Sequence, residues 1–316
     1  MSSTSDSTSG VSSYNEWDPL EEVIVGDVAG AMRPAWNVIN RETVPAFAVE
    51  ALRTMNENAG TPFDEETVAA AKRALNGFVE LLEAEGVRVR RPDQFRHSAP
   101  FSTPDWSVPS GYCAANPRDV FLVVGDEVIE AAMPDRGRHY EAWPYRRLLL
   151  DYFRAGARWT AAPKPRLLDG LYQQPGFSAE SGPPTCYVTN ESEPVFDAAD
   201  FVRCGRDIIA QRSHVTNELG IAWLERHLGS EYRVHRISTR CREPMHIDTT
   251  LMPLAPGKLL VNPEFVDVKQ IPQAFRSWDI LEAPRPVARF ADRRGKAVVS
   301  DWMSMNVLML DTTRVV

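Results

Sequence analysis

Val120-Phe-Leu-Val-Val-Gly-Asp-Glu-Val-Ile129 is the stretch that decides the fold, because it holds the smallest unit of a pattern that recurs along the chain. Two apolar runs flank Gly125-Asp126, a pair typical of a tight turn between antiparallel strands. Apolar side chains then recur at helical spacing over residues 145–153, which predicts a helix after the hairpin. The stretch therefore predicts a unit made of a hairpin and a helix.

The same order of elements recurs downstream. Two more hairpins are expected over residues 196–212 and 245–262. Each is followed by a helical and a strand-like stretch: 216–228 and 232–237 after the first, 271–278 and 280–281 after the second. A last hairpin spans 305–316, so its helix and closing strand are expected after Val316. Such repeats often surround a shared centre, so the pattern predicts an α/β ring of modules that is open at an incomplete last module.

Upstream of the opening stretch, the chain predicts a tail, a strand, a helix and a second strand. Residues 1–13 are rich in Ser, Thr and Gly, which predicts a disordered tail and neither a secretory signal nor a transit peptide. Strands are expected over residues 19–26 and 87–90, and Thr61 is expected to cap the helix between them. Residues 14–316 are therefore expected to form a single domain.

Composition narrows the class of partner. The net charge is -8 and no apolar run is long enough to span a bilayer, which argues against nucleic acid and membrane as partners. The four cysteines, Cys113, Cys186, Cys204 and Cys241, form no close pair, so neither a zinc knuckle nor a disulfide framework is expected. The sequence favours a small-molecule partner and a reducing, cytoplasmic location.

His246 and Asp248 are the first candidates for chemistry. They are two residues apart in an expected strand, where alternate side chains share one face. A carboxylate beside a histidine favours the imidazolium form and can tune it for proton transfer. By spacing alone a hydrogen-bonded surface pair is the more common interpretation, and a metal site would need further ligands that the other histidines do not supply by spacing.

Asp119 and Asp197 each lie at the entrance of an apolar strand. Carboxylates in such positions can bind a cation, and a planar guanidinium suits them because it forms bidentate pairs. An aspartate before a strand is also ordinary turn chemistry, so spacing alone leaves both interpretations open.

Several segments together resemble one enzyme family, the L-arginine:glycine amidinotransferases. The opening Val11-Ser-Ser-Tyr-Asn-Glu-Trp-Asp-Pro-Leu-Glu-Glu-Val-Ile-Val-Gly26 is similar to the start of these enzymes. Further similar segments follow in family order: Thr103-Pro-Asp-Trp106, Pro117-Arg-Asp119, Ala162-Pro-Lys-Pro165, Phe196-Asp-Ala-Ala-Asp200, Gly205-Arg-Asp-Ile208, Met245-His-Ile-Asp248 and Ser304-Met-Asn-Val-Leu-Met-Leu-Asp311. The resemblance covers nearly everything after residue 11, and this collinearity favours the catalytic interpretation of His246 and Asp248.

The resemblance implies a fold and a reaction. The fold would be a pseudo-fivefold α/β propeller of hairpin-helix-strand modules, shared with arginine deiminases and dimethylarginine hydrolases. In the reaction, a cysteine thiolate attacks the guanidinium carbon of L-arginine, ornithine leaves, and the amidino group passes to an amine such as glycine. No metal or organic cofactor is implied, and a homodimer is compatible with the resemblance.

Roles follow from the resemblance residue by residue. His246 would be the general acid and base, and Asp197 would orient it and balance its charge. The remaining matches would bind substrate: Asp119 and Asp248 would hold the guanidinium, and Met245 and Ser300 would line the site.

The sequence departs from the family pattern in two places. Phe265 stands where the family usually has an arginine that receives the substrate carboxylate. The family nucleophile lies in a Gly-rich segment that would fall beyond Val316, and none of the four cysteines present is expected to replace it. The 316-residue chain is therefore expected to be inactive and less stable than a completed one. A hydrolase or deiminase of the same superfamily and a non-catalytic guanidino-compound binding protein are the alternatives.

Overall fold

The computed structural model describes residues 10–44, 48–178, 182–287 and 300–316. Residues 1–9 of the expected tail lie outside this part of the chain. Val11 is buried in the core, and Ser13 pairs with Gly125 at the tip of the first expected hairpin. The chain is therefore packed against the domain from its first described residues.

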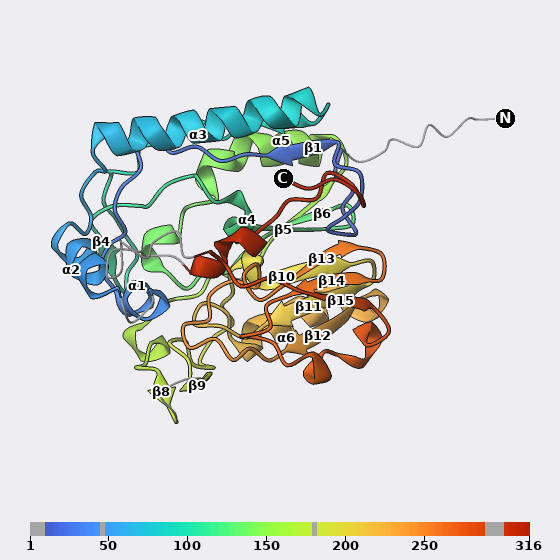
Figure 1. Ribbon diagram of the computed structural model, residues 1–316. Helices are drawn as coiled ribbons and strands as arrows, with labels where there is room; N and C mark the ends of the chain where they lie inside the picture. The colour runs from blue at the N-terminus through green and yellow to red at the C-terminus, as the bar shows by residue number, and fades with distance from the viewer. Residues whose placement is uncertain (1–9, 45–47, 179–181, 288–299) are drawn as a thin grey trace.

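The expected hairpins form the main sheets of a mixed α/β fold (Figure 1). In each of three sheets an antiparallel hairpin is joined by a third strand that runs parallel to the second. The strands are β5 (Phe121–Val124), β6 (Glu127–Glu130) and β7 (Arg158–Ala161); β10 (Phe201–Cys204), β11 (Asp207–Gln211) and β12 (Arg233–Ile237); and β13 (Leu251–Ala255), β14 (Lys258–Val261) and β15 (Asp279–Glu282). The crossover helices of the first two sheets are α5 (Arg146–Arg154) and α6 (Glu218–Leu228).

A fourth unit combines an N-terminal segment with the C-terminal hairpin. β1 (Glu22–Ile24) runs parallel to β2 (Arg88–Arg90), and the crossover between them contains the long helix α3 (Glu65–Ala84). The expected last hairpin is confirmed, because Met309 pairs with Val315 in antiparallel fashion. Its Leu310 carbonyl accepts a hydrogen bond from Leu20 N–H at 2.9 Å, so the hairpin lies beside β1.

Three expected boundaries were wrong for local reasons. The cap of α3 is Asp64, which accepts from Thr67 N–H, whereas the Thr61 hydroxyl donates to the Asn58 carbonyl. In the third sheet the expected helix 271–278 is only a short 3-10 turn, η7 (Gln273–Phe275). β13 begins at Leu251, so the residues before it, including His246, are not in a strand.

The sheet of β10 and β11 is buried on both faces. Phe201 and Ile208 pack into a core shared with β5 and β6, whereas the neighbouring Val202 and Ile209 pack into a second core with β13 and β14. This alternation is the period-2 geometry of a strand. The β10–β12 sheet therefore lies between the other two three-stranded sheets.

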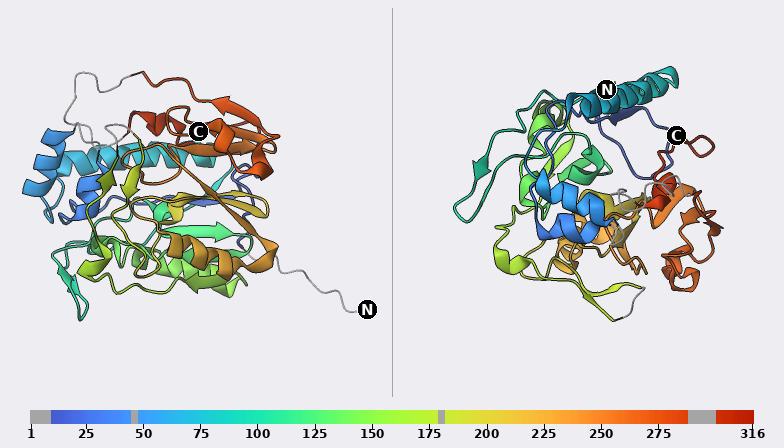
Figure 2. Two further views of the ribbon diagram at one scale, coloured as in Figure 1. Left: turned by 90° about the horizontal axis from the view of Figure 1, so that it is seen from below. Right: turned by 60° about the vertical axis from the view of Figure 1, so that its left-hand side comes forward.

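Shorter elements cover the ends of the sheets. They are α1 (Val38–Thr43), α2 (Val49–Glu57), α4 (Pro117–Val120), β3 (Phe101–Ser102), β4 (Ser107–Val108), β8 (Gly176–Phe177) and β9 (Pro184–Cys186). The 3-10 turns, besides η7, are η1 (Arg136–Arg138), η2 (Trp143–Tyr145), η3 (Asp169–Leu171), η4 (Ala198–Asp200), η5 (Gly229–Glu231), η6 (Val268–Gln270) and η9 (Asp301–Met305). α1 and α2 lie away from the β13–β15 sheet in Figure 1 and in the left-hand view of Figure 2.

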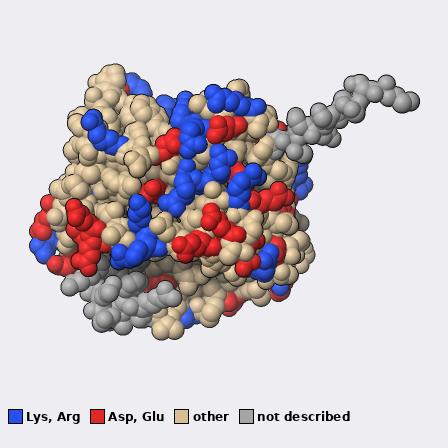
Figure 3. All heavy atoms as spheres, turned by 90° about the horizontal axis from the view of Figure 1, so that it is seen from above, with Lys and Arg blue, Asp and Glu red and all other residues tan. Residues whose placement is uncertain are grey.

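Two surface properties complete the description. On the face over α3, Lys and Arg side chains are interspersed with Asp and Glu (Figure 3). None of the helices in the described ranges combines the length and the apolar character needed to cross a bilayer.

Two helix glycines provide a test of the packing. A Cβ added at Gly220 in α6 would lie 2.2 Å from the Val195 carbonyl oxygen, whereas one added at Gly77 in α3 would meet nothing within 4 Å. We expect Gly220→Ala to lower the free energy of unfolding by about 1–3 kcal/mol through overpacking. Gly77→Ala should raise it by about 0.5–1 kcal/mol through helix propensity. Urea unfolding measures both, and equal effects of the two substitutions would contradict the close approach of α6 to Val195.

Candidate active site

The site is built from short turns that lead into the first strand of each hairpin. They are α4 before β5, η4 before β10, the turn at residues 247–250 before β13, and η9 before the last hairpin. α4 and η4 are in contact, and Ile247 N–H donates to the Ala199 carbonyl in η4 at 3.0 Å. Because the turns meet at one end of the sheets, residues from four distant segments are brought together.

His246 lies at the centre of this group. Its Nε2 is 3.0 Å from Asp197 Oδ2, and its Nδ1 is 3.6 Å from Asp119 Oδ1. The backbone of His246 has φ 61°, a left-handed conformation that is uncommon for a residue other than glycine. The expectation of a strand at this point was wrong, whereas Asp197 lies beside the imidazole as the resemblance implied, and Asp119 lies on its other side.

The surroundings of His246 favour its charged form. Burial by itself lowers the pKa of the imidazole, but Asp119, Asp197 and Asp248 outweigh that effect and raise the pKa to about 10. The side chain is 13% exposed and Asp197 only 2%, so solvent screens the pair little. At neutral pH the imidazole is therefore a cation.

Arg138 is a second cation that the sequence analysis did not single out. Its guanidinium donates to Asp119 at 2.9 Å, to Asp197 at 3.4 Å and to Glu141 at 2.6 and 2.8 Å. Burial raises the pKa of Asp119, but His246 and then Arg138 outweigh it and hold that pKa below its usual range. Burial raises the pKa of Glu141 to about 7 despite Arg138. The positive charge of Arg138 thus compensates several carboxyl groups within one buried region.

Asp248 lies beside the same group and also forms a hydrogen bond with a segment near the C-terminus. Its Oδ2 accepts a hydrogen bond of 2.8 Å from Asn306, which directly follows η9. Burial raises the pKa of Asp248, with His246 acting in the opposite direction. Asn306 lies inside a segment that carried the family resemblance, but an asparagine between apolar residues gave no signal of its own.

Met245, Ser300 and Phe265 each have local partners outside this polar group. Met245 packs against the buried cluster of Ile39, Val188 and Val215, under helix α1. Ser300 caps η9, its hydroxyl accepting from Trp302 N–H at 3.2 Å. Phe265 packs in an apolar cluster with Trp302 and Met305 of η9.

A layer of buried polar residues positions Asp197 through hydrogen bonds. Asp200 accepts hydrogen bonds from Ser213 at 2.6 Å, from Thr216 at 2.5 Å and from Gln211 at 3.2 Å. Thr216 also accepts from Asp197 N–H at 3.2 Å. Burial raises the pKa of Asp200 to about 6, and His246, Ser213 and Thr216 moderate the increase. Sequence reasoning missed this layer because a polar run after a strand is typical of an exposed loop.

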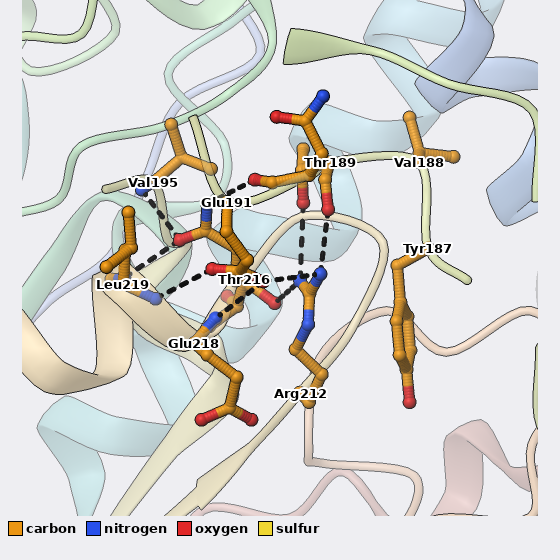
Figure 4. A network of polar contacts seen from close by, with 12 residues as sticks. Tyr187, Val188, Thr189, Glu191, Val195, Arg212, Thr216, Glu218 and Leu219 are labelled. Carbon is orange, nitrogen blue, oxygen red and sulfur yellow. Dashed lines mark hydrogen bonds and ion pairs between the residues drawn. The ribbon is translucent and has the colours of Figure 1, made fainter. Parts of the chain in front are cut away.

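Arg212 links this layer to the neighbouring loop that contains Thr189. Figure 4 shows its guanidinium between Thr189 and Thr216, whose carbonyls it contacts, with Tyr187 alongside. The guanidinium carbon is 4.4 Å from the centre of the Tyr187 ring. Glu191 forms an ion pair with Arg212 at 3.1 Å and also accepts from Leu219 N–H in the first turn of α6. The network ties the loop before η4 to α6.

The four cysteines are free thiols, and Cys113 lies close enough to Glu141, Arg138 and Asp119 to interact with their charges. Burial raises the pKa of Cys113 and of Cys241 to about 12 and also raises the pKa of Cys204. Within the described ranges, the side-chain partners of the imidazole are carboxylates and not thiols. No three metal-ligating side chains gather closely enough to hold an ion in the part of the chain that the structure describes.

Comparison with known proteins decides the family. The chain is 47% identical over 309 residues to the L-arginine:L-lysine amidinotransferase of Pseudomonas savastanoi pv. phaseolicola, and the match spans 98% of this chain and 83% of that protein. The chain belongs to the amidinotransferase family. It is also 44% identical to the mitochondrial glycine amidinotransferase of Gallus gallus, over 96% of this amidinotransferase chain and 72% of the relative.

A solved amidinotransferase confirms the relationship in three dimensions. SxtG of Microseira wollei, an amidinotransferase in the saxitoxin biosynthetic pathway, superposes with a TM-score of 0.91 at 57% identity. The match covers 96% of this chain and 85% of that one. No family model matches the chain. The amidinotransferase assignment therefore rests on whole-chain similarity, and the chain is a transferase by family.

The charge of His246 makes stability depend on pH. Its pKa is raised above the ordinary 6.5, so its stabilising contribution is complete below about pH 6.5 and is lost as the pH rises through about 10. We expect the free energy of unfolding in urea to fall across that window. His246→Gln should show a smaller fall, because only the groups common to both proteins still titrate. Equal falls in the two proteins would count against a charged His246.

Proposed function

We propose that this amidinotransferase site moves the amidino group of L-arginine to an amine through an amidino-cysteine intermediate. The observation that carries the proposal is the buried contact of His246 with Asp197, with Asp119 and Asp248 beside it. Such an arrangement combines a proton donor with carboxylates that suit a planar cation. Family membership supplies the reaction class.

Asp119 and Asp248 are proposed to hold the guanidinium. The carboxyl groups of this region outnumber its cations, and the raised pKa values of Glu141, Asp200 and Asp248 reflect incomplete compensation, which favours entry of a further cation. The carboxyl groups are those of Asp119, Glu141, Asp197, Asp200 and Asp248, and the cations are Arg118, Arg138 and His246. A guanidinium offers hydrogen bonds in a plane that two carboxylates can share. Met245 and Ser300 are proposed to line the path of the rest of the substrate.

His246 is proposed to move the proton. When a thiolate attacks the guanidinium carbon, the bond from that carbon to the ornithine nitrogen breaks and the leaving amine needs a proton. An imidazole with a pKa of about 10 carries that proton at neutral pH, and Asp197 keeps its Nε2 oriented. In the second half-reaction the neutral imidazole takes a proton from the attacking amine, and the thiolate leaves.

Residues 1–316 are proposed to bind arginine without turning it over. Cys113, Cys204 and Cys241 are held in the protonated form by burial. The imidazole contacts carboxylates and not one of the described thiols. This observation also favours the second candidate function, a guanidino-compound binding protein.

Glycine is the proposed acceptor from the family resemblance, and the product would be guanidinoacetate, the precursor in creatine biosynthesis. L-lysine is an alternative, because one relative is an L-arginine:L-lysine amidinotransferase. Phe265 supports an acceptor whose carboxylate is not held at that position, since a phenyl ring packed against Trp302 offers no cation. A cytoplasmic location and a homodimer are also proposed.

The modules are further proposed to surround a pseudo-fivefold axis. Three sheets share one strand order, the central one is buried on both faces, and their entry turns meet at the candidate site. The β1–β2 unit and the last hairpin would supply the remaining parts of the ring.

Arginine binding tests the guanidinium site. Calorimetry should show saturable binding of L-arginine to residues 1–316. Asp248→Asn should weaken it about tenfold or more, because a charge-assisted hydrogen bond is lost. Asp93→Asn is the matched control, since Asp93 is exposed and pairs with Arg147. The site would be assigned wrongly if the wild-type chain bound no arginine or if both variants bound it equally well.

Product analysis tests the reaction. We expect no ornithine when residues 1–316 are incubated with L-arginine and either glycine or L-lysine and the products are analysed by mass spectrometry. Ornithine above the level of an enzyme-free blank would refute the proposed inactivity. A longer chain that carries a nucleophilic cysteine after Val316 should form ornithine and the amidinated amine in equal amounts. Citrulline from that chain would identify a hydrolase instead.

A further inference from the structure

The peptide group between His246 and Ile247 is held at both of its polar atoms. The His246 carbonyl accepts a hydrogen bond of 2.9 Å from Gln211 Nε2. The Ile247 N–H donates to the Ala199 carbonyl at 3.0 Å. A peptide plane fixed on both edges cannot rotate without losing a buried hydrogen bond.

This restraint coincides with an unfavourable backbone conformation. His246 has φ 61°, a region in which a Cβ is crowded, so the conformation persists only where the surroundings impose it. Rotation of this peptide group would change ψ of His246 and release the backbone that carries the imidazole beside Asp197. The two hydrogen bonds are therefore the restraint that keeps His246 in contact with its carboxylate.

Gln211 is suited to impose the restraint. It lies at the end of β11 and is fully buried. Its Nε2 donates both to the His246 carbonyl and to Asp200 Oδ1 at 3.2 Å, whereas its Oε1 has no partner. The opposite orientation of the amide would place its oxygen against two acceptors, so the environment allows one orientation.

The group that orients Gln211 also positions Asp197. Asp200 is fixed by the hydroxyls of Ser213 and Thr216, and Thr216 accepts from Asp197 N–H. Ala199, which holds Ile247, lies in η4 between Asp197 and Asp200. The short segment of η4 therefore fixes the Asp197 carboxylate directly and the His246 backbone through Gln211.

We propose that Gln211 is a positioning residue that holds the His246 backbone in its left-handed conformation, so that the imidazole meets Asp197 and the adjacent Asp248 meets the substrate guanidinium. This inference rests on the proposed function for the role of arginine, but not for the contact between His246 and Asp197. Gln211 touches neither the substrate nor the reacting atoms.

The test replaces Gln211 with an isosteric side chain that cannot donate. In Gln211→Met, NMR titration of His246 without arginine should show its pKa lowered by at least about one pH unit, because the imidazole has moved from its carboxylates. The dissociation constant for L-arginine should rise about tenfold. Gln173→Met is the matched control: Gln173 is exposed and also donates to a backbone carbonyl, that of Tyr187. It should leave both quantities unchanged.

The outcomes separate positioning from simple stabilisation. If Gln211→Met lowers the free energy of unfolding but leaves the His246 titration and the arginine affinity unchanged, the proposal is overturned. Should Gln211→Met fail to fold, Gln211→Asn keeps the amide but shortens its reach, and it must show the same two changes in smaller degree. An altered His246 titration in a protein that binds no arginine at all would support Gln211 and overturn only the guanidinium site.

Discussion

The contact between His246 and Asp197 is the interaction on which the rest of the site depends. Desolvating a carboxylate is costly unless a cation or hydrogen-bond donors compensate it, and here several carboxyl groups are buried within one region. His246 and Arg138 provide the compensation, each facing more than one carboxylate. The arrangement keeps several carboxyl groups in one region because each of these two cations is shared among them.

The architecture explains why such groups meet. A short turn precedes the first strand of each hairpin, so the repeated module delivers a polar residue to the same end of its sheet. Asp119, Asp197 and Asp248 therefore each lie shortly before the first strand of a hairpin, although no sequence motif relates them. Family members similar to this chain act with lysine, with glycine or in the saxitoxin pathway, as their names state. A common core with varied surroundings is the simplest physical account of that variety.

The sequence predicted the parts of this arrangement that depend on periodicity and strand position. Alternating apolar runs and turn glycines located the hairpins, and Asp119 and Asp197 stood out because each precedes an apolar strand. Arg138, Gln211 and Asn306 were missed, because their roles come from contacts between distant segments that leave no local pattern. The conformation of His246 was also unpredictable, since a left-handed histidine is imposed by tertiary hydrogen bonds against its own preference.

The two-sided burial of the β10–β11 sheet has a consequence for how this family can diverge. On an ordinary half-exposed sheet, every second position is free to drift, because its side chain faces water. Here adjacent residues such as Phe201 and Val202 belong to different cores, so neither register offers that freedom. A substitution in the central sheet therefore perturbs one core or the other, whereas exposed segments outside the sheet lack this double constraint.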